Sequence, residues 1–427
     1  MHTTSPAGRR IGIAGTVTGI GLALALVIPS GANAAPVVSQ ANGRLIDTTL
    51  LSTDALDSIA SLGGAKAVNS DGTDAVTSNT PLDPTALSSL DLPIQGVNLF
   101  GNQGIIQLGG VGQFAQANGD GSSVAFSGAV TQASSLAGIG TDVTPSNIGS
   151  PAPGSNAEVK IGNPATDPAT IDVQWGLLAA SAKQTVDGTQ TGSYTAEAKT
   201  IQVGGTVLSP ALAAIDGPLK TLLGVANGLG VDVDDPIAGD TVTVTMDDIL
   251  AVAGVSSIND LPAGTDLVQY VPQAVANKIK EMVNDTLTSV STAASGLGLV
   301  GLPLSTALTT AKAAINPLLS ALSTNVVAPL STALTAVAQL KVNVQTHHTD
   351  GSFTETALQV GLGPDGSLGQ VNLANATVGP NGGLVAVPVV NSASAGIAGG
   401  ALAAGLAIVC ATVLARRRNA LVQTARN

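Results

Sequence analysis

The pattern of apolar and polar positions first indicates strands in the region that follows residue 90. Residues 94–100, 104–117 and 123–132 are rich in Val, Ile, Phe and small residues. The last two runs are separated by Asn118-Gly119-Asp120-Gly121, a composition typical of a β-hairpin turn. We therefore expect an antiparallel pair of strands around this turn.

A second group of alternating runs lies between residues 157 and 207. The alternation is clearest at 158–161, 170–178 and 195–203. Turns are predicted at Asn163-Pro164 and Asp187-Gly188, because these residue types favour tight reversals. Short strands at this spacing predict sandwich-like antiparallel sheets.

From Pro210 to Gln339 the apolar period becomes helical. Apolar residues between Pro272 and Ala293 recur near every 3.6 positions, as in an amphipathic helix with one buried face: Val275, Ile279, Met282, Val283 and Leu287. One short strand is expected at Asp240–Thr245, followed by a helix start at Asp247 and Asp248.

An imperfect repeat lies in the helical region. Pro303-Leu304-Ser305-Thr306-Ala307-Leu308-Thr309 recurs at 329–335, with a looser copy from Pro317. Proline favours the first helical position, so the pattern predicts helices restarted by proline. None is then expected to cross a bilayer unbroken, and we expect a helical insertion that packs on the sheets.

Strands return after the helices. Residues 341–345 alternate, and 352–361 with 370–378 predict a hairpin around Pro364-Asp365-Gly366. The helices are therefore expected to interrupt one β domain, although two separate domains remain an alternative. The predicted fold class is mainly β, with an Ala/Leu/Thr-rich α-helical insertion.

The N-terminus has the pattern of a cleaved signal peptide. Arg9 and Arg10 precede an apolar stretch from Ile11 to Ile28, and Ala32-Asn33-Ala34 offers a cleavage site. Cleavage is expected after Ala34. Export through the Sec or the twin-arginine route, and retention of this stretch as a membrane helix, remain open.

The C-terminus has the pattern of a membrane anchor. Residues 395–415 carry no charge, and at about 1.5 Å each they would span about 31 Å, close to the hydrocarbon core of about 30 Å. Arg416, Arg417 and Arg418 follow, which favours a cytoplasmic tail. Cys410, the chain's single cysteine, lies in this segment and is assigned no role.

These patterns give the expected organisation of the chain. The segments are a signal peptide at 1–34, a partly loop segment at 35–89, a β-rich region at 90–208, a mostly helical insertion at 209–340, a completing β-hairpin at 341–378, a spacer at 379–394, a transmembrane anchor at 395–415 and a basic tail at 416–427.

The charge of the chain limits the classes of partner that it can bind. All 28 acidic residues lie between the two apolar ends, and the whole chain has a net charge of −12. Nucleic-acid binding depends on Lys and Arg that displace counterions from phosphates, so nucleic acid is excluded as a partner. The expected partners are the membrane, through the C-terminal helix, and cell-envelope polymers or other surface proteins.

Few residues suggest a catalytic or metal-binding site. His347 and His348 stand near Asp350, but adjacent residues of a strand point to opposite faces, and no Gly-x-Ser-x-Gly elbow lies in the exported part. The acidic group Asp232, Asp234, Asp235 and Asp240 lacks the register of a calcium loop. No catalytic, cofactor-binding or metal residue is therefore assigned, and no cofactor is expected.

Two glycine patterns match a dinucleotide fingerprint without its strand-to-helix context. They are Gly296, Gly298 and Gly301, and Gly361, Gly363 and Gly366. Of the candidate sugar-stacking aromatics Trp175, Tyr194 and Tyr270, we expect Trp175 to be a core residue, because it lies on the apolar face of an alternating run.

Four short motifs resemble the choice-of-anchor G family of actinobacterial surface proteins. They are Gly43-Arg44-Leu45-Ile46, Val97-Asn98-Leu99, Val173-Gln174-Trp175-Gly176 and the hairpin at 352–378. The resemblance implies surface display in a Gram-positive bacterium and brings no catalytic residues. No Leu-Pro-x-Thr-Gly sorting signal precedes the apolar C-terminal segment, which puts covalent attachment to the wall in doubt.

The first hypothesis is a membrane-anchored cell-surface protein with a noncatalytic structural or adhesive ectodomain outside the plasma membrane. The alternative is a membrane-tethered extracellular hydrolase or a calcium-dependent binding module. The alternative requires a pocket that unites His347 or His348 with a carboxylate.

Overall fold

The computed structural model describes residues 37–50, 62–80, 93–94, 97–98, 106–108, 111–129, 157–237 and 239–382. The expected signal peptide, transmembrane segment and basic tail lie outside these residues.

A six-stranded antiparallel sheet, sheet A, joins the two ends of the described chain. Its order is β13-β14-β15-β16-β1-β2. The strands are β1 (Ser39–Thr48), β2 (Ala65–Asn69), β13 (Thr265–Asp266), β14 (Ala338–His347), β15 (Phe353–Leu362) and β16 (Gly369–Val378). Since β16 pairs with β1 from Ala41↔Val378 to Thr48↔Val371, the strands on either side of the helices form one sheet.

A second antiparallel sheet, sheet B, has the order β12-β11-β10-β8-β7-β3, with β9 joining β10 to β6. The strands are β3 (Val76–Asn79), β6 (Ile106–Leu108), β7 (Val111–Ala117), β8 (Ser123–Ala129), β9 (Ala157–Ile161), β10 (Thr170–Gln184), β11 (Gln190–Gly204) and β12 (Val242–Val244). Two short strands, β4 (Pro93–Ile94) and β5 (Val97–Asn98), pair with each other.

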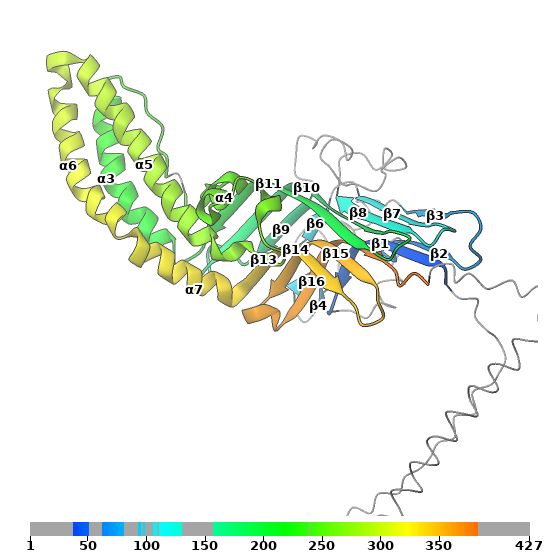
Figure 1. The fold of residues 1–427 in the computed structure, drawn as a ribbon. Coiled ribbons are helices and arrows are strands. Elements are labelled where there is room, and N and C mark those ends of the chain that lie inside the picture. The colour runs from blue at the N-terminus through cyan, green and yellow to red at the C-terminus, as the bar shows by residue number, and fades with distance from the viewer. Residues whose placement is uncertain are drawn as a thin grey trace, which may run out of the picture. The chain divides into compact units, whose positions relative to one another are not determined.

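The two sheets pack face to face. Strands β1, β15 and β16 of sheet A contact β7, β8, β10 and β11 of sheet B, and Figure 1 shows the layers. Small residues allow a close approach at one point, because a Cβ on Gly43 would overlap the carbonyl oxygens of Phe114 and Phe126. The mainly β, sandwich-like fold expected from the sequence is confirmed.

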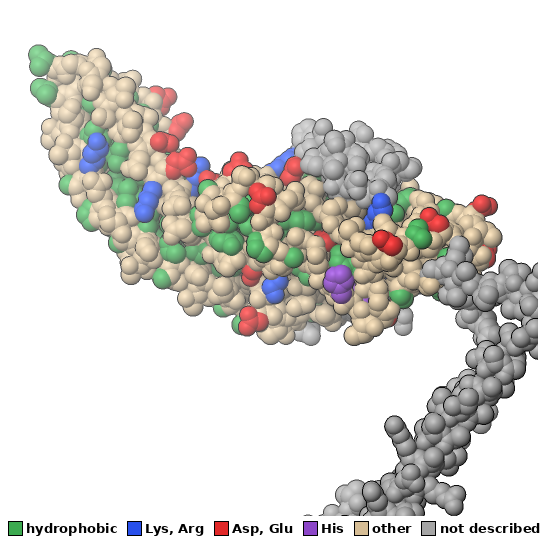
Figure 2. Space-filling view, viewed as in Figure 1, with side chains coloured by type: hydrophobic (Ala, Val, Ile, Leu, Met, Phe, Trp, Pro, Cys, Tyr) green, Lys and Arg blue, Asp and Glu red, His purple; other side chains and the backbone are tan. Residues whose placement is uncertain are grey.

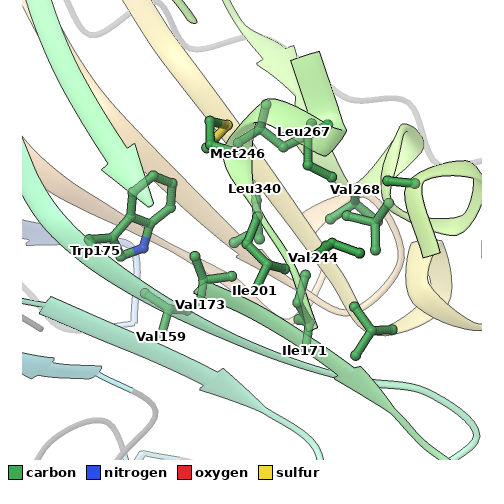
Figure 3. Close-up of a cluster of buried hydrophobic side chains, with 14 of the residues drawn as sticks. Val159, Ile171, Val173, Trp175, Ile201, Val244, Met246, Leu267, Val268 and Leu340 are labelled. Atoms are coloured by element: carbon green, nitrogen blue, oxygen red, sulfur yellow. The ribbon is translucent and has the colours of Figure 1, made fainter. Parts of the chain in front are cut away.

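The core is mainly aliphatic, and Trp175 is the largest of its fully buried side chains. Figure 3 shows Trp175 of β10 beside Val173 and Val159, with Ile201 of β11 and Leu340 of β14 nearby. Trp175 is fully buried, so its assignment to the core is confirmed. The same alternation that predicted this strand places its apolar face inward.

The predicted hairpins are present. β7 and β8 flank Asn118–Gly121, and β15 and β16 flank a 3₁₀ turn at Pro364–Gly366. The region 35–89, expected to be partly loop, contributes β1 to the interior of sheet A. Its strand was missed because Asn42, Arg44 and Asp47 give it a polar face.

The helices are α3 (Ser209–Gly228), α4 (Met246–Ala253), α5 (Val271–Gly296), α6 (Leu302–Ser320) and α7 (Ala328–Val337). The start of α4 is a capping box, in which the Thr245 hydroxyl accepts the Asp248 N–H and the Asp248 carboxylate accepts the Thr245 N–H. The amphipathic pattern of α5 is confirmed, with Val275, Ile279, Val283 and Leu287 buried.

Two expectations about the helices were wrong in part. Pro303 and Pro329 stand in the first turns of α6 and α7, but Pro317 lies inside α6, which continues through it to Ser320. The helices also do not all pack on the sheets. Strands are contacted by α4, α5 and α7, whereas the main contacts of α6 are with α3 and α5.

Candidate functional site

In three neighbouring strands of sheet A, the alternation of inward and outward side chains is interrupted at the same level of the sheet. Each has two consecutive fully buried residues, Leu45-Ile46 in β1, Ala357-Leu358 in β15 and Leu373-Ala374 in β16. A regular strand alternates at every residue, so the backbone must depart from regularity at this level. Ala374 does so with a φ of 58°.

Where the alternation is interrupted, the spacing between outward-pointing residues changes from two positions to three. On the outer face the sequence runs Asn42, Arg44, Asp47 in β1, and the neighbouring strands repeat it as Thr354, Thr356, Gln359 and as Thr377, Asn375, Asn372. These nine residues come from three adjacent strands, and together they line one hollow.

We call this hollow the sheet A groove; its volume is about 370 Å³. Its lining residues are Asn42, Arg44, Asp47, Val344, Thr346, His348, Asp350, Ser352, Thr354, Thr356, Gln359, Asn372, Asn375 and Thr377. The lining is almost entirely polar and contains no aromatic platform other than His348.

Cross-strand hydrogen bonds order the groove floor. Thr354 and Thr377 hydroxyls lie 2.8 Å apart, the Thr356 hydroxyl donates to Asn375 Oδ1 at 2.7 Å, and Gln359 Nε2 donates to Asn372 Oδ1 at 2.9 Å. Each pair is also directly opposite in the strand register. The floor is therefore a ladder of amides and hydroxyls held in fixed positions.

One end of the groove carries the histidine singled out from the sequence. His348 Nε2 lies 2.9 Å from the Thr354 hydroxyl, while Asp350 Oδ1 accepts the Ser352 N–H at 2.9 Å and the Ser352 hydroxyl at 2.7 Å. These bonds, with a smaller contribution from His348, hold the pKa of the Asp350 carboxyl below its usual range. Asp350 is therefore a stable anion.

The two histidines separate at the end of β14, whose last residue is His347. The His347 ring packs against Phe353 in a tilted arrangement, with ring centroids 4.9 Å apart, and of the two histidines only His348 lines the groove. The Ser352 hydroxyl bonds to Asp350 and not to His348, so the described geometry lacks the nucleophile-to-base contact of a serine hydrolase.

The acidic loop after α3 does not gather around a point. Asp235 Oδ1 accepts the Ile237 N–H at 3.0 Å, and Asp235 Oδ2 lies 3.9 Å from Lys220 Nζ. Within the described ranges, no three His, Cys, Asp or Glu side chains come together as a metal site.

The glycine patterns lie at turns. Gly296, Gly298 and Gly301 connect α5 to α6, and Gly361, Gly363 and Gly366 belong to the β15–β16 hairpin. Neither connects a strand to a helix. Tyr194 is buried and Tyr270 half-buried, so neither forms an exposed stacking platform.

A titratable group that the sequence did not single out lies on the inner face of β15. Glu355 is fully buried, and neither carboxylate oxygen has a hydrogen-bond partner. Burial raises the pKa of the Glu355 carboxyl to about 8, and the Gln345 side chain has a smaller, lowering effect on this pKa. The alternation of β15 places Glu355 on the inner face, whereas Thr354 and Thr356 are on the outer face. Because Glu355 is polar, the sequence pattern did not indicate that it is buried.

Apart from His348 and Asp350, the groove residues were not singled out from the sequence, although the strands that carry them were largely predicted. Thr, Asn and Gln on the exposed side of a strand resemble an ordinary solvated face. Their gathering depends on the changed spacing in β1, β15 and β16, which no single segment reveals.

Comparison with known proteins gives a family without an assigned function. Residues 41–239 and 297–379, more than half of the chain, match the family described as a domain of unknown function, DUF8394. These ranges include every groove residue. No curated protein and no solved structure matches the chain. The chain therefore belongs to the DUF8394 family.

Proposed function

We propose that this protein is an exported, membrane-anchored surface protein with a noncatalytic adhesive ectodomain, and that the sheet A groove binds a hydroxyl-rich polymer of the cell envelope. The observation that carries the proposal is the ladder of paired amides and hydroxyls along three strands. Such groups exchange hydrogen bonds with polymer hydroxyls at little cost in reorganisation.

The chemistry of the groove favours binding. Asp350 is held as an anion by the Ser352 bonds, and His348 contacts a threonine hydroxyl. A general acid or base needs a pKa near the working pH and a reacting partner within reach. The floor instead offers donors and acceptors in register with the strands.

Location is supported by the sequence of the two ends. The apolar stretch after Arg9 and Arg10 favours export, and the uncharged segment 395–415 before three arginines favours a single anchor. The resemblance to the choice-of-anchor G family supports the same display on a bacterial surface.

Protease shaving of intact cells tests the location. Peptides from residues 37–382 should be released and identified by mass spectrometry, whereas peptides from 416–427 should remain with the cells. Recovery of the unprocessed chain in the soluble cell fraction would refute export and anchorage.

Binding is tested with the full chain and insoluble polysaccharide prepared from the cell envelope. The groove pair Gln359→Ala with Asn372→Ala should lower the retained fraction at least several-fold. A matched control is Gln174→Ala with Thr200→Ala, which removes a cross-strand hydrogen-bonded pair from sheet B. Equal retention of the two double variants would refute the groove as the binding site.

A tethered hydrolase is the second candidate, because the groove brings His348 and Asp350 together. If it is correct, the wild-type chain should release soluble fragments from the same polysaccharide, and His348→Ala should abolish the release. Retention without fragment release would favour the adhesive function.

A further inference from the structure

The turn between α5 and α6 exposes three large apolar side chains. Leu299 is 85% exposed, Val300 63% and Leu302 60%. They lie together in a short 3₁₀ turn and at the first residue of α6. We call residues 297–302 the helical tip, and Figure 2 shows apolar side chains at this end of the helices.

Two glycines give the tip a defined shape. Gly298 has a φ of 57°, a conformation that other residues rarely adopt. A Cβ on Gly301 would overlap the Ala294 carbonyl oxygen. The chain therefore turns tightly here, while Leu297 packs against the core, and the turn directs Leu299 and Val300 outward.

The segments of α5 and α6 that adjoin the tip carry no charge over a long stretch, whereas α3, which packs against α6, carries the Asp216–Lys220 ion pair. Residues 286–311 contain no Asp, Glu, Lys, Arg or His, and Asp285 and Lys312 bound them. At about 1.5 Å per helical residue, Asp285 lies about 18 Å and Lys312 about 15 Å from the tip along the helix that carries it. These lengths are close to half of a hydrocarbon core that is about 30 Å thick.

Most hydroxyls of this stretch donate a hydrogen bond within their own helix. Five of them donate to the carbonyl oxygen four residues earlier, at 2.9 to 3.1 Å. They are Thr292, Ser295, Thr306, Thr309 and Thr310. Ser and Thr can satisfy their hydrogen bonds in this way on a helix, so their transfer into an apolar medium leaves no free donor.

The apolar character of α6 is stronger than its prolines suggested. Because the helix continues through Pro317, Gly298–Ser320 is long and apolar enough, by length and composition alone, to cross a membrane. Lys312 and the contacts of α6 with α3 and α5 are typical of a helix in a bundle. Only the tip is therefore considered for insertion into a membrane.

We propose that the helical tip inserts into one leaflet of a lipid bilayer. This goes beyond the proposed function, because it rests on neither the groove nor the C-terminal segment. Three side chains form too small a patch for a standard protein interface, which buries about 800 Å² per partner. Asp216 and Lys220 on α3, which packs against α6, restrict insertion to the tip itself.

The test places one fluorescent label on the full chain, in a Cys410→Ser background that removes the single natural cysteine. An environment-sensitive label is attached after Val300→Cys. The matched control is Val186→Cys, because Val186 is 60% exposed in the β10–β11 turn. The probe is vesicles of phosphatidylcholine, with and without a quencher in the acyl chains.

The label at position 300 should shift to shorter wavelengths with vesicles and be quenched by the acyl-chain quencher, while the label at position 186 should do neither. Leu299→Asp with Leu302→Asp should abolish both effects at position 300. The readout is local, so attachment of the chain elsewhere does not produce it. A shift at position 300 without vesicles that grows with protein concentration would show that a second copy covers the tip, and no shift at all would equally overturn the proposal.

Discussion

Gly192 of β11 faces the carboxylate of Glu355 across the sandwich, and a Cβ at position 192 would overlap Glu355 Oε2. The absence of a side chain at position 192 therefore makes room for a buried carboxyl that has no hydrogen-bond partner. A buried acid without a partner favours the protonated form, which links this contact to the pH dependence of stability.

Glu355→Gln should stabilise the protein at neutral pH and have little effect in acid. The folded-state pKa is about 8, above the ordinary value of 4.5, so the folded state binds the extra proton between these values. Stability is then lost as the pH rises from about 4.5 to about 8. We expect a gain on the order of 2 to 4 kcal/mol at pH 7.5, measured by urea unfolding at pH 4 and pH 7.5. A gain that is equal at both pH values would contradict the assignment.

Gly192→Ala should destabilise the fold by about 1 to 3 kcal/mol, because the added methyl overpacks the space held by Glu355. Gly217→Ala is the control, since nothing lies within 4 Å of a Cβ there and alanine favours a helix. The double variant with Glu355→Ala should recover part of the loss in a thermodynamic cycle. Additive effects would show that the two residues do not interact.

The interrupted alternation in β16 predicts different losses of stability for glycine substitutions at two buried alanines. Ala374 and Ala376 are both fully buried, but only Ala374 has a positive φ, at 58°. Ala376→Gly should cost about 1 kcal/mol or more. Ala374→Gly should cost about 1 kcal/mol less than that, because glycine relieves the left-handed conformation. Chemical denaturation of both variants measures the difference, and equal losses would argue against strain at Ala374.

Thr245→Ala should remove the N-cap of α4 and lower stability by about 0.5 to 2 kcal/mol. The Asp248 N–H loses its acceptor, while Ile249 in the first turn is fully buried. Thr245→Ser keeps the hydroxyl oxygen and should retain most of the stability in thermal unfolding. A serine variant as unstable as the alanine variant would show that the threonine methyl, and not the cap, matters.

Local pattern determined most of the individual elements. Alternation and turn residues predicted the β7–β8 and β15–β16 hairpins, and the helical period predicted α5, because each signal depends on residues close together in the chain. The exclusion of Trp175 from the surface followed from the same alternation.

Tertiary structure decided how these elements combine. Only the pairing of β1 with β16 shows that sequence on both sides of the helices builds one sheet, and pairing across more than 300 residues leaves no local signal. The groove likewise depends on three strands that change face along the same row, which brings Asp47, Gln359 and Asn372 to one surface. The burial of Glu355 against Gly192 depends on the approach of two sheets, a packing relation that neither segment encodes alone.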